Sequence, residues 1–149
     1  MMTMTKAIMF DMDGVLAGLY DVPNWLEYLI ANDPTPYRVA QPLVNMSHLA
    51  RLLNRLQADG WHIGIVSWLS KNATVEYNDA VTLAKREWLA RHLKSVHWDE
   101  IKIIPYGTPK QEVVDVVGGI LFDDEIPNRK NWVGVAYDET QIFEILRTL

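Results

Sequence analysis

The sequence predicts a doubly wound α/β fold, in which helices cover both faces of a mainly parallel sheet. Five short apolar runs alternate with helical patterns along the 149 residues, and this alternation is typical of strands joined by crossover helices. The runs lack regularly spaced polar residues, so we expect strands buried on both faces. A hydrophobic fraction of 49% supplies enough apolar side chains for one buried core.

The first strand is expected in Lys6-Ala-Ile-Met-Phe-Asp11, an apolar run that ends in an acidic loop. Similar runs predict four more strands, at 61–67, 101–105, 119–123 and 132–136. Together they make a sheet of five strands.

The helical patterns lie between these runs. The clearest pattern precedes Gly60, a residue type that commonly follows a helix end, and it places leucines at helical spacing, at Leu49, Leu52, Leu53 and Leu56. We expect a second helix at about 79–96 and a terminal helix at about 142–149.

The segment at about 18–41 fits this alternation least well. It contains three prolines, four aromatic residues and one short helical pattern near 25–31, and we interpret it as a small insertion over the edge or mouth of the sheet. We expect one domain over 1–149 that includes this insertion. Its aromatics could stack on a nucleobase, although aromatics among prolines more often form a satellite core: Tyr20, Trp25, Tyr28 and Tyr37.

Composition excludes several classes of protein. The absence of cysteine excludes disulfides, thiolate metal sites and thiol nucleophiles, and it fits a cytoplasmic location. A net charge of −5 argues against binding to duplex nucleic acid. No apolar run approaches the ~20 residues of a membrane helix, and the first six residues lack the pattern of a secretory signal.

Polar side chains lie at or directly after the ends of three predicted strands. Asp11 and Asp13 follow the first, Ser67 ends the second, and Asp123 and Asp124 follow the fourth. The carboxyl ends of parallel strands share one edge, where ligands bind in open α/β sheets. Two carboxylates ~4 Å apart repel by about 4 kcal/mol at a protein surface, so such a cluster needs a cation. Oxygen ligands without cysteine or a histidine pair favour Mg²⁺ over zinc.

The first acidic motif also suggests a reaction. Asp11 and Asp13 are separated by one residue, and Gly14 permits a turn that keeps them close. One carboxylate could attack phosphorus and form an aspartyl phosphate, while a second protonates the leaving oxygen and later takes a proton from water. We therefore predict Asp11 as the nucleophile and Asp13 as the general acid/base.

These motifs resemble those of the haloacid dehalogenase-like superfamily of phosphatases. The matching residues are Asp11-Met-Asp13-Gly-Val-Leu16 after an apolar strand, Ser67 after Gly64-Ile-Val66, and Asp123-Asp124 after Ile120-Leu-Phe122. The resemblance implies a Rossmann-like three-layer α/β/α sandwich and a Mg²⁺ ion near Asp11. It implies that Asp13 ligates the metal through its carbonyl, that Ser67 binds the phosphoryl group, and that Asp124 is the direct metal ligand with Asp123 beside or behind it.

The resemblance also requires a phosphate-binding lysine, for which the sequence offers two candidates. Lys110 opens a short helical stretch before the fourth strand. Lys85 lies in a run similar to the Glu-Lys-x-x-Trp helix of the 5′(3′)-deoxyribonucleotidase branch, and residues 121–128 resemble the ending of that branch. We prefer Lys85 and keep Lys110 as the alternative.

The expected function is a magnesium-dependent phosphatase acting on a phosphorylated small molecule, with deoxynucleoside 5′-monophosphates as the substrates that the branch implies. The segment between Gly14 and Gly60 is shorter than the helical cap of that branch, so we expect a minimal cap or none. Such a site would take a large substrate, for example a phosphorylated nucleic-acid end, or would be completed by a neighbouring subunit in a homo-oligomer.

Two non-catalytic alternatives remain. A receiver-like phospho-acceptor module also uses a carboxylate cluster and a lysine, but its acceptor follows the third strand, where this chain has Pro105 and no aspartate. A degenerate phosphatase retained for binding is the other, and the intact Asp11, Asp13 and Asp124 argue against it.

Overall fold

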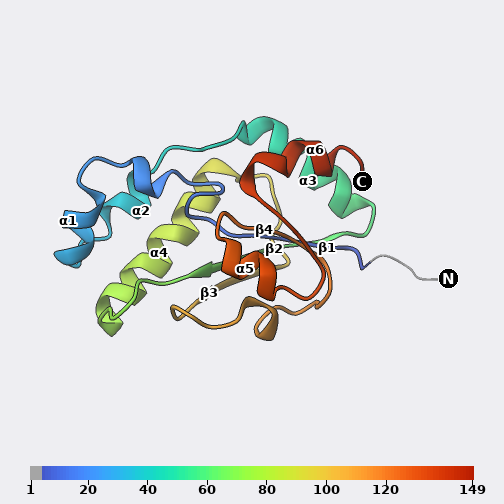
Figure 1. Cartoon of the computed structure of the whole chain (residues 1–149). Helices are drawn as coiled ribbons and strands as arrows, with labels where there is room; N and C mark the ends of the chain where they lie inside the picture. The colour runs from blue at the N-terminus through green and yellow to red at the C-terminus, as the bar shows by residue number, and fades with distance from the viewer. Residues whose placement is uncertain (1–4) are drawn as a thin grey trace.

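A five-stranded parallel sheet forms the centre of the protein (Figure 1). The computed structural model describes residues 5–149. The expectation that the first six residues are not a secretory signal falls mostly on residues 1–4, which lie outside this range. The strand order is β3-β2-β1-β4-β5, and every neighbouring pair is parallel. The strands are β1 (Ala7–Phe10), β2 (His62–Trp68), β3 (Glu100–Ile104), β4 (Ile120–Phe122) and β5 (Val135–Tyr137). The predicted Rossmann-like α/β fold is confirmed.

Residues 5–149 contain six α-helices: α1 (Trp25–Ile30), α2 (Thr35–Val39), α3 (Met46–Ala58), α4 (Val75–His92), α5 (Ile126–Asn131) and α6 (Ile142–Leu146). The larger core lies between one face of the sheet and α3, α4 and α6. All four leucines of the predicted stripe on α3 are buried there, as the apolar spacing requires. Within residues 5–149, no helix is long and apolar enough to cross a membrane.

The other face of the sheet carries a thinner layer. Met9, Val66 and Leu121 pack there against Val114 and Trp132, which come from the connections after β3 and α5. The connection after β3 contains one short 3₁₀ helix, η2 (Lys110–Glu112), in place of a long crossover helix. This short path holds Lys110 close to the sheet.

Two elements begin three or more residues away from the predicted start. α4 begins at Val75, about four residues early, because the Thr74 hydroxyl caps it by accepting a hydrogen bond from the Tyr77 N–H at 3.1 Å. β5 begins at Val135 instead of 132. Trp132 is not part of the strand; its indole N–H donates to the Gly119 carbonyl at 3.0 Å in the core.

The segment at 18–41 contains η1 (Leu19–Asp21), α1 and α2 and lies beside α4 (Figure 1). We call this segment the roof. Two side chains of α4 donate to backbone carbonyls at its end: the Trp88 indole to Ala40 at 2.8 Å and the Arg91 guanidinium to Arg38 at 2.7 Å. Tyr37 lies in a small core shared with α4. The roof is therefore held to α4 by both hydrogen bonds and apolar packing.

Candidate active site

The predicted site residues meet at the carboxyl edge of the sheet. Asp11 extends β1, since its N–H donates to the Phe122 carbonyl at 2.9 Å, and Asp123 extends β4 by donating to the Tyr137 carbonyl at 3.1 Å. Oxygens of Asp11, Asp123 and Asp124 lie within 4.8 Å of one another. Two strands far apart in sequence, β1 and β4, thus place their terminal carboxylates in one cluster, as parallel pairing predicts.

A tight turn after β1 shapes this cluster. The Met12 carbonyl accepts hydrogen bonds from the N–H groups of Val15, Leu16 and Ala17 at 2.9–3.1 Å. Gly14 takes a left-handed conformation, with φ +80°, and a β-carbon there would lie 2.3 Å from Asp124 Oδ2. Only glycine leaves room for that carboxylate.

Lys110 connects the ends of β1 and β4. Its buried ammonium donates to Asp11 Oδ1 at 3.1 Å and to Asp123 Oδ2 at 2.6 Å. Burial alone would lower the pKa of Lys110, but the two carboxylates outweigh burial and raise it. The ammonium therefore stays charged beside the predicted nucleophile.

Lys85 connects the ends of β1 and β2 from its position on α4. Its ammonium donates to Asp13 Oδ2 at 3.0 Å, to Ser67 Oγ at 2.8 Å and to the Trp68 carbonyl at 2.9 Å. The side chain is buried beneath Tyr37, whose ring centroid lies 5.3 Å from the ammonium. Both candidate lysines thus lie at the site, with different partners.

Asp124 is the acid that neither lysine neutralises. No lysine, arginine or histidine of residues 5–149 forms an ion pair with it. Burial, the charge of Asp11 and a hydrogen bond with Asp11 raise the pKa of Asp124 to about 8. When the three aspartates of the cluster and Asp13 are all ionised, they exceed the two ammonium groups by two charges, which one divalent cation would balance. The carboxylates of Asp11, Asp123 and Asp124 are therefore the residues that could hold a metal ion.

An open cavity of about 260 Å³ lies over the cluster. Asp11, Asp13 and Asp124 contribute to its lining, whereas Ser67 and both lysines lie behind it. Five aromatic side chains line the cavity, from the roof, the end of β2 and the loop after β3: Tyr20, Trp25, Tyr37, Trp68 and Tyr106.

Sequence analysis missed several of these wall residues. Ser70, Lys71 and Tyr106 closely follow the ends of β2 and β3, while Glu125 and Asn128 follow β4, and all five line the cavity. The strand-end rule that located the aspartates would also have located these residues, had it been extended a few positions into each loop.

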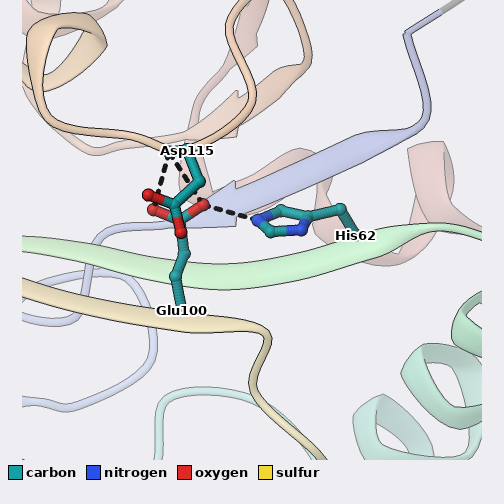
Figure 2. A group of neighbouring side chains, drawn as sticks. All are labelled: His62, Glu100 and Asp115. Carbon is teal, nitrogen blue, oxygen red and sulfur yellow. Dashed lines mark hydrogen bonds and ion pairs between the residues drawn. The ribbon is translucent and has the colours of Figure 1, made fainter.

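A second polar cluster lies at the opposite edge of the sheet (Figure 2). The buried Glu100 carboxylate accepts from His62 Nε2 at 2.5 Å, and both of its oxygens accept from the Asp115 N–H at 3.1 Å. A β-carbon at Gly64 would lie 2.6 Å from Glu100 Cγ, so glycine makes room for this side chain. Because Asp115 lies five residues after Lys110, the cluster anchors the segment that carries Lys110.

Comparison with known proteins finds similar folds among solved structures. Neither the protein-family models nor the curated proteins give a match to the chain. Among solved structures, a D,D-heptose 1,7-bisphosphate phosphatase from B. bronchiseptica, complexed with magnesium and phosphate, is similar at a TM-score of 0.53 and 18% identity, covering 88% of this chain and 78% of that one. A hydrolase from Streptococcus pneumoniae TIGR4 is similar at a TM-score of 0.53 and 12% identity, covering 97% and 100%. At these identities the likeness shows a shared fold, and it agrees with the Rossmann-like α/β fold that the sequence predicts.

Proposed function

We propose that the protein is a Mg²⁺-dependent phosphatase that hydrolyses phosphate monoesters through an aspartyl phosphate on Asp11. The observation that carries this proposal is the convergence of Asp11, Asp13 and Asp124 on the cavity, with two buried ammonium groups directly behind them. The similarity of the fold to that of solved phosphatases supports it.

In the first step, a carboxylate oxygen of Asp11 attacks phosphorus. Asp11 Oδ1 accepts from Lys110, which leaves Oδ2 to form the new P–O bond. The ester P–O bond breaks, and its oxygen leaves as an alcohol with a proton from Asp13. The Lys110 ammonium offsets the negative charge on the phosphoryl oxygens.

In the second step, water attacks the phosphorus of the aspartyl phosphate. Asp13 takes a proton from that water, the bond between phosphorus and Asp11 breaks, and inorganic phosphate leaves. Asp13 alternates between acid and base, so it returns to its starting state after each turnover. The Ser67 hydroxyl donates to a phosphoryl oxygen in both steps.

The donor set fits magnesium. Asp11 and Asp124 supply carboxylate oxygens, and the family resemblance adds the backbone carbonyl of Asp13. Asp123 is less available, because Oδ2 accepts from Lys110 and Oδ1 accepts from the Glu125 N–H at 2.9 Å. We therefore infer that Asp124 binds the ion directly and that Asp123 holds Lys110. When bound, the ion neutralises charge on the phosphoryl group and on the two carboxylates.

For the substrate, we propose nucleoside 5′-monophosphates. Two aromatic pairs lie at the cavity, Tyr20 with Trp25 at a centroid distance of 5.2 Å and Trp68 with Tyr106 at 5.0 Å. Aromatic faces and edges of this kind bind flat bases, while the carboxylate end of the same cavity receives the phosphate.

The activity is tested with purified full-length protein, p-nitrophenyl phosphate and added Mg²⁺. Asp11→Asn should abolish turnover, whereas Asp79→Asn, a matched change on the exposed face of α4, should leave it unchanged. Equal activity in wild type and Asp11→Asn would refute the nucleophile assignment. A panel of deoxynucleoside monophosphates, sugar phosphates and 5′-phosphorylated oligonucleotides then tests the substrate class. A higher kcat/KM for sugar phosphates or oligonucleotide ends would contradict the nucleotide proposal.

A further inference from the structure

We propose that the two buried lysines have separate tasks, because Lys85 is a positioning residue that orients Asp13 and Ser67 without touching phosphate. Lys110 is then the phosphate-binding lysine that the family resemblance requires. This inference rests on the phosphatase function proposed above. It reverses the preference for Lys85 that sequence analysis suggests.

The first argument is the number of hydrogen-bond donors on each ammonium. A lysine ammonium has three N–H donors and no acceptor. Those of Lys85 are matched by three acceptors at 2.8–3.0 Å, on Asp13, Ser67 and Trp68. The side chain is 1% exposed. To bind phosphate, Lys85 would have to abandon one of these acceptors.

One of the three N–H donors of Lys110 has no acceptor among the described residues. Its ammonium makes two hydrogen bonds, to Asp11 and Asp123, and no third acceptor lies within reach among residues 5–149. It lies beside the nucleophilic carboxylate and 5.6 Å from the ring centroid of Trp68, which lines the cavity. A phosphoryl oxygen near Asp11 would supply the missing acceptor.

The contacts of Lys85 orient two groups that the reaction needs. By holding Oδ2 of Asp13, Lys85 leaves Oδ1 for the proton that passes to the leaving oxygen. The Ser67 oxygen accepts from Lys85, so the hydroxyl hydrogen points away from the ammonium and is available to phosphate. The third contact, to the Trp68 carbonyl, fixes the end of β2.

Tyr37 of the roof shields the hydrogen bonds of the Lys85 ammonium from water. The Tyr37 ring lies against the Lys85 ammonium, and the Tyr37 hydroxyl is within hydrogen-bond distance of Ser70 Oγ, at 3.1 Å. Water therefore has little access to the three hydrogen bonds, which strengthens them relative to exposed ones. Lys85 is thus set in place before any substrate arrives.

The experiment compares Lys85→Gln and Lys110→Gln, with Lys94→Gln, at an exposed lysine two residues after α4, as the control. Phosphate affinity is measured by calorimetry and by inhibition of turnover. Lys110→Gln should weaken phosphate binding about tenfold or more, the usual effect of losing a charged hydrogen bond. Lys85→Gln should change it less than about threefold, and Lys94→Gln should not change it.

A second readout isolates the role of Lys85 in proton transfer. Phenyl phosphate has a poor leaving group and needs the acid, whereas p-nitrophenyl phosphate needs it much less. Lys85→Gln should lower kcat for phenyl phosphate about tenfold more than for p-nitrophenyl phosphate, and Lys110→Gln should lower both equally. In an Asp13→Asn background, Lys85→Gln should have no further effect on this ratio.

The proposal is overturned if Lys85→Gln weakens phosphate binding as much as Lys110→Gln, or if it slows both substrates equally. If circular dichroism shows that Lys85→Gln does not fold, the test depends on Lys110→Gln. Phosphate affinity that is unchanged in Lys110→Gln would then be enough to overturn the proposal. Absence of turnover in the wild type would refute the phosphatase function, while phosphate binding that depends on Lys110 and not on Lys85 would still support the separate tasks.

Discussion

Replacing Gly14 by alanine tests whether the turn after β1 holds Asp124 in position for the metal. Two effects follow from the geometry. The left-handed conformation at φ +80° costs an alanine about 1–2 kcal/mol. The new β-carbon would also lie 2.3 Å from Asp124 Oδ2, where ordinary contact begins at 3.4 Å, so the carboxylate must retreat by about an ångström.

Gly60→Ala separates these two effects. Gly60 has φ +94° and no atom within 4 Å of a built β-carbon, so its substitution adds strain without a clash. Both variants should lose similar stability, which corresponds to a melting temperature lower by about 3–6 °C. Only Gly14→Ala should lose affinity for Mg²⁺ and with it about 100-fold in activity.

The assay is thermal unfolding with and without Mg²⁺, followed by a Mg²⁺ titration of turnover. An ion that binds only the folded protein adds about 2.7 kcal/mol of stability at 100 times its Kd. Wild type and Gly60→Ala should gain this stabilisation, and Gly14→Ala should gain much less. If Gly14→Ala binds Mg²⁺ like the wild type, or if Gly60→Ala loses as much affinity, the role assigned to Asp124 is wrong.

Three further predictions concern stability. Asp123→Asn removes the buried charge that Lys110 contacts at 2.6 Å, so the free energy of unfolding should fall by about 3 kcal/mol in urea titrations; a change below about 1 kcal/mol would contradict a structural role for this pair. Glu100→Ala removes the acceptor of the Asp115 N–H, so that amide should exchange with deuterium at least about tenfold faster, and unchanged protection would show that the segment is anchored elsewhere. Burial would raise the pKa of Asp99, but hydrogen bonds from β2 and α3 outweigh it and lower the pKa. Its stabilising contribution is therefore complete above the unfolded pKa of about 3.9 and is lost as pH falls below that value. The Asn variant should lose less stability than the wild type on acidification below pH ~4, and parallel curves would argue against the contribution.

Local patterns predicted the sheet well because burial on both faces leaves a continuous apolar run, which needs no knowledge of the partner strand. The same reasoning failed at β5, where Trp132 belongs to the core beneath the sheet and not to the strand. An aromatic residue in an apolar run satisfies either arrangement, and only the packing against Gly119 distinguishes them.

The start of α4 shows a related limit. The Thr74 hydroxyl caps the helix, so α4 begins at Val75, about four residues before the start predicted at 79. Leu83 of α4 is exposed, whereas Lys85, two residues later, is buried. A lysine on a helix faces water in most proteins, so its sequence position alone does not reveal a buried ammonium.

By itself, the sequence determined the five strands, the helices α1, α3, α4 and α6, and the aspartates that end β1 and β4, because these depend on residues close together in the chain. The tertiary structure alone decided which ammonium lies against which carboxylate. Lys85 meets Asp13 across 72 positions and Lys110 meets Asp11 across 99. Such pairings depend on how α4 and the connection after β3 pack against the sheet, and that packing is a property of the whole folded chain.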